Sequence, residues 1–227
     1  MKFVRSTLAA PSLLALSLVL APAAANAAPT IWSGTGATDS VNFGQLGNFT
    51  QVSSGTALTS VGGLGLTLTT GTGGQAQRLN QGNGWGGNFA PGATLLYNQT
   101  AGDLTFTFAN AVRGVGAQFQ ANFFGPFTAR VTTNDGSFFD VPGVSNSNGN
   151  NSAIFIGVQN TVANITSIRF HQQTGTGGND FAVGNLSLLT GGGVPEPTTW
   201  ALMIVGFGAV GGAMRTRRSK VSVRFAG

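Results

Sequence analysis

The stretch LTFTF, residues 104–108, decides the fold class of this chain, because apolar and small polar residues alternate in it one by one. Such a period of two is typical of a β-strand with one buried face. The same alternation runs through residues 115–121 and 127–132, and leucines at every second position of 64–68 repeat it. A hairpin signal, Asn134-Asp135-Gly136-Ser137, follows the last of these segments. The sequence therefore predicts an all-β fold, an antiparallel, jelly-roll-like β-sandwich of about eight to ten strands.

Three further segments, 153–158, 165–171 and 181–189, complete the predicted strands. The first is a short apolar run, so we expect a strand that is buried on both faces. Residues 71–92 show no alternation, and we expect a long surface loop that carries Trp85. The chain has 36 glycines, but its 17 phenylalanines supply apolar surface that disordered segments lack. We therefore expect one sandwich domain over residues 28–190.

The first 27 residues have the order of a secretory signal peptide. Lys2 and Arg5 precede an apolar core at 8–20, and Ala25-Asn26-Ala27 forms a cleavage site of the A-x-A type. We expect the export machinery to translocate the chain and signal peptidase to cut after Ala27. An N-terminal anchor that is not cleaved is the alternative.

The other end of the chain reads as a membrane-stop signal. Two prolines flank Glu196 and interrupt regular structure, which predicts a linker over residues 191–199. An uncharged apolar run then predicts a short hydrophobic helix over 200–214, although spanning a bilayer takes about 20 residues. The tail 215–227 is basic, which predicts a cytoplasmic location for it. Its cationic cluster consists of Arg215, Arg217, Arg218 and Lys220.

This order of features, with the string PEPTTWA at residues 195–201, resembles the PEP-CTERM sorting domain in its PEPxxWA variant. The resemblance implies that the tail is recognised and removed by an exosortase, an integral-membrane sorting enzyme related to cysteine proteases. It also implies an exported protein at the cell envelope, at the cell surface or outside the cell, held transiently at the inner membrane. An ordinary anchor behind a proline linker is the alternative. The implied motif residues are Pro195, Glu196, Pro197, Trp200 and Ala201.

The middle of the chain resembles, more loosely, secreted β-sandwich domains that are found ahead of this tail. The similar segments are 112–118, 155–158, 165–168 and 179–186. Gly184 stands where those domains usually have an aspartate, which puts any role of that carboxylate in doubt for this chain.

Charge and composition exclude several classes of function. The whole chain has a net charge of +5, but residues 29–193 carry four arginines and five aspartates, a formal charge of −1. Because no basic patch remains in the domain, we expect no nucleic-acid partner. The absence of cysteine excludes disulfides, zinc–thiolate sites, iron–sulfur clusters and cysteine nucleophiles.

A catalytic arrangement is not evident, and we expect no enzyme. The single histidine, His171, falls beside Arg169 on the polar face of a predicted strand, and no G-x-S-x-G motif occurs. The only glutamate lies in the tail, and the aspartates occupy turn positions. These aspartates are Asp39, Asp103, Asp135, Asp140 and Asp180.

Two kinds of ligand site stay open. No resident cofactor is expected, but Asp180 follows a glycine-rich loop that could offer carbonyls to a structural calcium ion, and Asp39 is a second candidate. Trp85, Phe89 and Tyr97 could form a platform that stacks on a sugar ring. Alternatively, Trp85 closes one end of the sandwich.

We therefore carry three functions for the exported domain. The first is a non-enzymatic structural or surface role, linked by the resemblance to exopolysaccharide and biofilm. The second is a carbohydrate-binding module with polysaccharide as partner. The third is ice binding, because the same tail occurs on some ice-binding proteins and Thr-x-Thr pairs stand at 67–69 and 105–107. Two separate pairs do not by themselves make a regular array.

Overall fold

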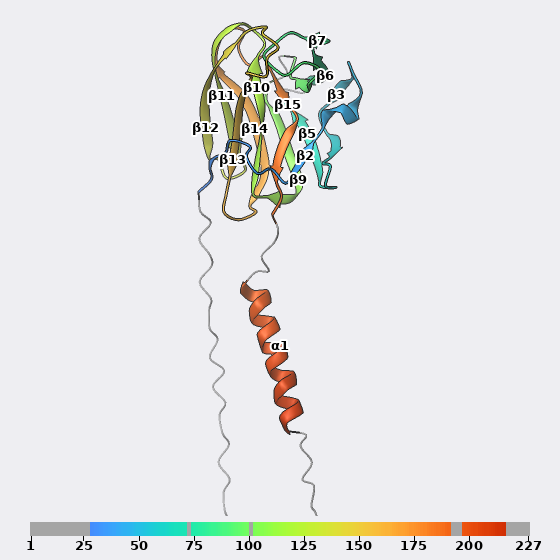
Figure 1. The fold of residues 1–227 in the computed structure, drawn as a ribbon, viewed down its shortest axis with the longest axis vertical. Helices are drawn as coiled ribbons and strands as arrows, with labels where there is room; N and C mark the ends of the chain where they lie inside the picture. Colours follow the sequence, from blue (N-terminus) through green and yellow to red (C-terminus); the bar gives the residue numbers. More distant parts are fainter. Residues whose placement is uncertain (1–27, 72–73, 100–101, 192–196, 217–227) are drawn as a thin grey trace, which may run out of the picture.

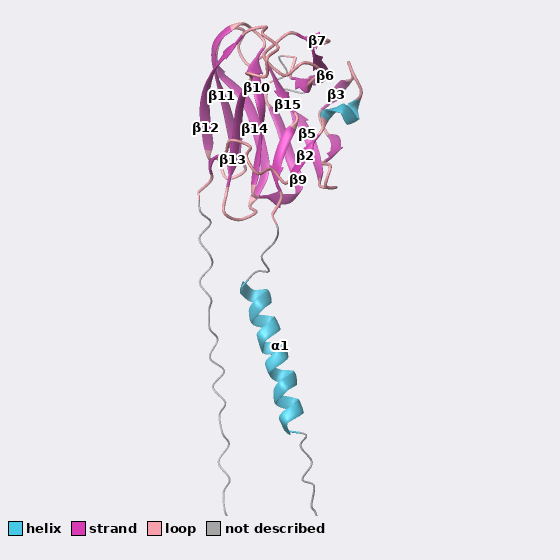
Figure 2. Cartoon of the chain, viewed as in Figure 1, coloured by secondary structure: helices cyan, strands magenta, loops and turns pink. Residues whose placement is uncertain are grey.

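The computed structural model describes residues 28–71, 74–99, 102–191 and 197–216. Two mainly antiparallel sheets pack face to face, and one α-helix among the described residues, α1 (Pro197–Thr216), follows them (Figures 1 and 2). The all-β sandwich is therefore confirmed. The described residues form sixteen strands, so the expected eight to ten is wrong. Several strands are only two to four residues long, which is too short for a recognisable alternation.

The six-stranded sheet shows the alternation that the sequence predicts. In β9, Leu104, Phe106 and Phe108 are buried, whereas Thr105 and Thr107 point to the outer face. The alternation of residues 127–131 and of Leu66 and Leu68 is found as well. In spatial order the strands are β12 (Phe138–Ser145), β11 (Gly125–Thr133), β14 (Ile165–Thr174), β9 (Leu104–Val112), β5 (Gly65–Thr70) and β4 (Thr56–Thr59).

The ten-stranded sheet is built from shorter strands. Its main path is β1 (Thr30–Ile31), β13 (Ile154–Gln159), β10 (Gly114–Ala121), β15 (Phe181–Gly184), β8 (Thr94–Tyr97), β6 (Gln75–Gln81) and β3 (Gln51–Ser53). β16 (Leu186–Leu189) pairs with β10 and with β2 (Asp39–Val41), and β7 (Gly84–Trp85) pairs with β6. The predicted surface loop over residues 71–92 is therefore wrong. Polar residues dominate β6, so its strand has no hydrophobic alternation to detect.

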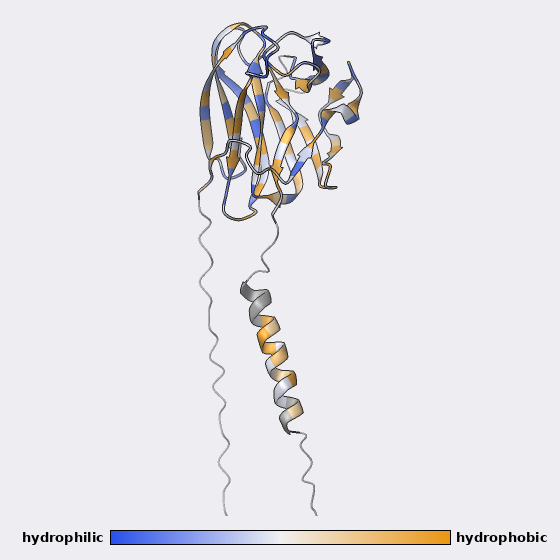
Figure 3. Ribbon diagram, in the orientation of Figure 1, coloured by the Kyte–Doolittle hydropathy of each residue, from blue (hydrophilic) through white to orange (hydrophobic). Residues whose placement is uncertain are grey.

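The main core fills the space between the two sheets with aromatic rings. Phe119 stacks on Phe181 with ring centroids 4.6 Å apart, and Phe106 meets Phe170 edge to face at 6.0 Å. Phe43, from the short 3-10 helix η1 (Phe43–Leu46), stacks on Phe106. In Figure 3, orange and blue residues alternate along many of the strands.

A second layer covers the outer face of the ten-stranded sheet. Trp85 and Phe89 form a small separate core there with Leu79, Leu95, Ala153 and Ala182. Trp32 packs edge to face on Phe155, whose ring covers two glycines of β10 and β13. β10 is therefore buried on both faces, and the expectation of one buried face for residues 115–121 is wrong.

The domain begins and ends at the same end of the sandwich. One cross-strand row contains Thr30, Gln159, Gly114 and Leu189, on β1, β13, β10 and β16. The first described residues and the end of β16 accordingly lie together at the lower end in Figure 1. The opposite end carries the loops 122–124, 146–153 and 175–180, which we call the far end.

Helix α1 starts three residues before the predicted residue 200 and ends two residues after 214. Proline suits the first helical position because its missing N–H has no partner there in any helix. Leu202, Ile204, Val205 and Phe207 are each about two-thirds exposed or more. Among the described residues, no helix combines the length and hydrophobicity needed to cross a membrane.

Candidate functional sites

The predicted sorting signal falls partly within α1. Pro197 is the first residue of the helix, Trp200 and Ala201 follow in its first turns, and Arg215 lies in its last turn. The other predicted residues of the two terminal signals lie outside the described residues. These are Lys2, Arg5, Ala25, Ala27, Pro195, Glu196, Arg217, Arg218 and Lys220.

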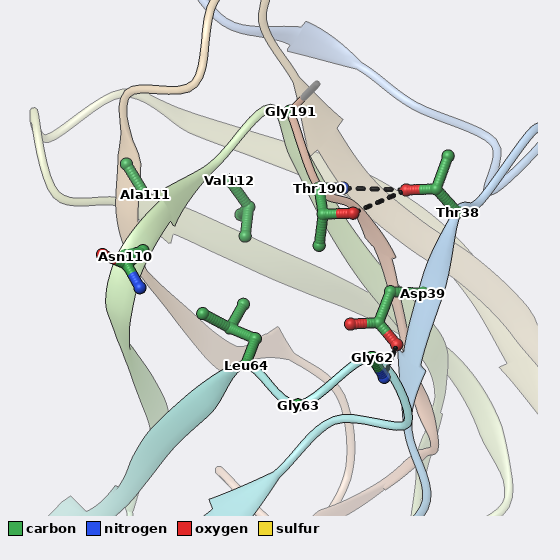
Figure 4. A pocket seen from close by; sticks show the side chains of 10 residues that line it. All are labelled: Thr38, Asp39, Gly62, Gly63, Leu64, Asn110, Ala111, Val112, Thr190 and Gly191. Carbon is green, nitrogen blue, oxygen red and sulfur yellow. Dashed lines mark hydrogen bonds between the residues drawn. The ribbon is translucent and has the colours of Figure 1, made fainter. Parts of the chain in front are cut away.

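The carboxylate of Asp39, a calcium candidate, is occupied by protein donors, of which Figure 4 draws Gly62. Its Oδ1 accepts the backbone N–H groups of Ser40 and Gly62, both at 2.7 Å, and its Oδ2 accepts the hydroxyl of Ser60 at 2.5 Å. Burial alone would raise the pKa of Asp39, but these hydrogen bonds outweigh it and lower the pKa. Asp39 therefore holds the turn between β4 and β5.

A pocket of about 370 Å³ lies beside Asp39 at the end of the sandwich where the domain starts and stops. The Thr38 hydroxyl lies 3.0 Å from that of Thr190, and a dashed line marks this contact in Figure 4. Most of the lining is small or apolar, and its single carboxylate is the occupied one. The lining residues are Thr38, Asp39, Gly62, Gly63, Leu64, Asn110, Ala111, Val112, Thr190 and Gly191.

Asp180 and Tyr97, predicted for different ligands, meet on the outer face of the ten-stranded sheet. Asp180 is 3% exposed; its Oδ2 accepts the Asn122 side-chain N–H at 3.1 Å, and its Oδ1 has no partner. The same Asn122 amide lies 3.3 Å from the Tyr97 hydroxyl. Burial, and then the negative charge of Asp180, raise the pKa of Tyr97 to about 12. Asn122 was missed because an asparagine after a strand reads as an ordinary turn residue.

The surroundings of Asp180 offer little to a calcium ion, which takes six to eight oxygen ligands. In the described part of the chain, no three His, Cys, Asp or Glu residues gather as metal ligands. Two nearby loop carbonyls are already used: that of Gly178 accepts the Asp180 N–H, and that of Asn179 accepts the Asn98 side chain. Calcium binding at Asp180 or Asp39 stays a prediction.

Two of the three aromatic rings predicted to bind a sugar have no exposed face. Trp85 is 6% exposed and Phe89 is fully buried, both in the small outer core. Tyr97 lies against Trp85 with ring centroids 5.2 Å apart. These rings cover the outer side of the ten-stranded sheet. This role resembles the alternative in which Trp85 closes one end of the sandwich.

His171 is paired on the outer face of the six-stranded sheet. Its Nδ1 lies 2.6 Å from Oδ1 of Asp103, and Arg169 lies 3.2 Å from Oδ2 of the same carboxylate. Asn179 donates a further hydrogen bond to Asp103 at 3.0 Å. Within the described residues, we find no serine or threonine hydroxyl bonded to His171. The histidine is therefore one of three side chains that contact the Asp103 carboxylate.

The two Thr-x-Thr pairs lie directly opposite each other on adjacent strands. Thr67 of β5 pairs with Thr107 of β9, and Thr69 pairs with Thr105. Ser167 of β14 extends the first row beside Thr107. We call these five residues the threonine face. Sequence reasoning could not find it, because the register between β5 and β9 is fixed only in the folded sheet.

The fold and the tail together define a β-sandwich protein with a C-terminal segment for sorting. Residues 193–218 match the PEP-CTERM protein-sorting motif, which supports export and processing by an exosortase. The match covers the tail and not the sandwich. No similarity to a curated protein was found.

Proposed function

We propose that this chain is an exported precursor whose tail is recognised and cut by an exosortase, leaving the sandwich at the cell envelope or surface. The observation that carries the proposal is the match of residues 193–218 to the sorting motif. The apolar side chains of α1 support it, because they are exposed and need an apolar partner such as lipid or a membrane enzyme.

Each part of the tail has a separate role in this proposal. Glu196 supplies the charge that the enzyme recognises. Trp200 sits at the membrane–water interface, which suits its amphipathic ring. The basic cluster Arg215, Arg217 and Arg218 stops translocation.

Replacement of Glu196 by alanine tests the proposal in native cells. We expect unprocessed precursor to accumulate in the membrane fraction while export stays intact, as followed by fractionation and immunoblotting. Asp140→Ala, which removes an exposed carboxylate from the sandwich, is the control and should be processed normally. Normal processing of the Glu196 variant would leave a plain anchor as the role of the tail.

Neutral residues in place of the three arginines should release unprocessed protein past the membrane.

We further propose that the sandwich acts without catalysis, as a surface or matrix component linked to exopolysaccharide. The contact of His171 with Asp103, which also binds Arg169, supports this, since within the described residues no serine or threonine hydroxyl is bonded to the histidine. A deletion strain complemented with the His171→Ala variant should recover the full matrix phenotype of the wild-type gene. Loss of the phenotype with normal amounts of the variant would point to chemistry at His171.

Ice binding is a second candidate because the structure joins the two threonine pairs into one face. Paired threonines on neighbouring strands present hydroxyl and methyl groups at regular spacings of about 4.8 Å across the strands and about 6.8 Å along them. Thr107→Lys should abolish thermal hysteresis if this face binds ice. Thr30→Lys, at an exposed position of the other sheet, should leave it unchanged. Absence of any hysteresis in the unmodified protein would reject this candidate.

A further inference from the structure

Two phenylalanine side chains are exposed at the far end of the sandwich. Phe123 is 46% exposed and Phe124 is 59% exposed, in the loop between β10 and β11. The register of β11 with β12 places Gly125 opposite Ser145 and therefore puts this loop beside the start of the asparagine-rich loop 146–153. Rings of this size are usually buried, so their joint exposure in one short loop needs an explanation.

The ring of Phe123 packs against the loop 175–180. A side chain at Gly177 would overlap this ring, so the ring rests directly on the glycine backbone. Gly177 also has a φ of +83°, a conformation that other residues rarely adopt. The ring of Phe123 is thus packed closely against the backbone at Gly177.

A groove of about 490 Å³ runs along β11 and β12, and its lining begins at Pro126, two residues after Phe124. This volume falls in the range of small-ligand sites. Val144, 60% exposed, forms one wall of the groove. The lining residues are Pro126, Phe127, Thr128, Pro142, Gly143, Val144 and Thr174.

The three loops of the far end expose no charged side chain. They contain a single ionisable side chain, Asp180, which is 3% exposed. The asparagine-rich loop that starts beside the two phenylalanines exposes amides instead, at Asn148, Asn150 and Asn151. Aromatic faces stack on the apolar faces of sugar rings, and amides hydrogen-bond to hydroxyl groups. An anionic polymer or an anionic lipid headgroup would find no cation in these loops.

We propose that the far end binds a neutral polysaccharide, with Phe123 and Phe124 stacking on sugar rings and the groove holding an adjacent part of the chain. The site goes beyond the sorting function and does not depend on it. It also differs from the platform of Trp85, Phe89 and Tyr97, which the outer core buries. Because the domain begins and ends at the opposite end, a tether at the tail leaves the far end open to the surroundings.

Affinity electrophoresis of the full chain in detergent tests the site, with gels that contain dextran, mannan, a soluble β-glucan or alginate. We expect at least one neutral polymer to retard the wild-type chain, and alginate not to. The double variant Phe123→Ala/Phe124→Ala should lose about tenfold or more in affinity, as expected when two stacking contacts disappear. Phe49→Ala is the matched control, since Phe49 is 50% exposed outside the far end. Its affinity should stay within about twofold of wild type.

Several outcomes would overturn the proposal. They are retardation by alginate alone or by no polymer, undiminished binding by the double variant, and an equal loss in the Phe49 variant. Concentration-dependent dimers that the double variant abolishes would assign the rings to a contact between copies of the chain. If the double variant fails to fold, Phe124→Ala and Phe124→Tyr replace it. The tyrosine should then retain the affinity that the alanine loses, and equal affinities would contradict the stacking role.

Discussion

The outer face of one sheet is covered by further protein, whereas the outer face of the other sheet is exposed. The outer face of the ten-stranded sheet is covered by Trp32 and by the segment that carries Trp85 and Phe89. The outer face of the six-stranded sheet is bare and carries the threonine face and ion pairs. One sheet is therefore a middle layer, and the other forms a surface.

Covered and bare faces impose different demands on the sequence. On the bare face, every second residue can be small and polar, since water satisfies it. On the covered face the outward positions must fit a second layer, and β10 and β13 place Gly116 and Gly157 under the ring of Phe155. The difference predicts how each face responds to substitution.

The largest loss of stability should come from truncating Trp85 in the small outer core that covers the ten-stranded sheet. Trp85→Ala leaves a cavity in the small outer core, and we expect it to lower the free energy of unfolding by about 3–5 kcal/mol. Thr67→Ala on the bare face should change it by less than about 0.5 kcal/mol. Urea denaturation of both variants checks this. Equal, small effects would mean that the cover contributes little to stability.

Two glycine substitutions sharpen the same contrast. A Cβ at Gly116 would lie 2.6 Å from the Cα of Gly157, so Gly116→Ala should cost about 1–3 kcal/mol. At Gly65 of β5, the nearest atom to an added Cβ is Ala109 Cβ at 3.7 Å, an ordinary contact. Gly65→Ala should be neutral or stabilise by up to about 1 kcal/mol, because it restricts the unfolded chain. Thermal melting of the pair measures both signs. A stable Gly116 variant would show that the cover can shift to make room.

The same contrast shows how much of the fold could be predicted from the sequence. The bare-face strand β9 was predicted because its buried and exposed residues alternate. Strand β6, QAQRLNQ, was missed, since the small outer core covers Leu79 and buried amide and guanidinium groups take the place of apolar ones. Alternation of apolar and polar residues marks a strand that has one face in water. It does not predict a strand whose outer face is covered by a second layer of protein.

The candidate sites divide along a similar line. The sorting motif is a local string and was found from the sequence, whereas the threonine face depends on the register of β5 with β9. Trp85 looked accessible because its neighbours are glycines, but short side chains also let the chain fold down onto a sheet. Phe123 and Phe124 follow a predicted strand directly, and nothing in their sequence separates an exposed ring from a buried one.

Tyr97 packs against the small outer core that covers the ten-stranded sheet, so its titration tests that region. It is the only tyrosine in the chain. Its pKa, raised to about 12, means that the folded state favours the neutral phenol. The associated stability is present below pH 10, the ordinary value, and is lost as the pH rises through about 12. Ultraviolet absorbance of tyrosinate should give the midpoint. Asp180→Asn should lower the midpoint without restoring the ordinary value, because burial remains. An unchanged midpoint would mean that Asp180 does not act on Tyr97.

The smallest change in the free energy of unfolding is expected for an ion pair on the bare outer face of the six-stranded sheet. Arg130 holds Asp140 with two hydrogen bonds of 2.7 and 2.8 Å, and these lower the pKa of Asp140. The stabilisation is present above the ordinary carboxyl pKa of about 4 and is lost as the pH falls through the lowered value. Because the pair is exposed to solvent and screened by salt, it should contribute little to the free energy of unfolding. Arg130→Gln should raise the pKa of Asp140 toward its ordinary value in a carboxyl NMR titration. Arg169→Gln, which removes the partner of Asp103 instead, should leave it unchanged. A large loss of stability in the Arg130 variant would show that this face is less open to water than its exposed side chains indicate.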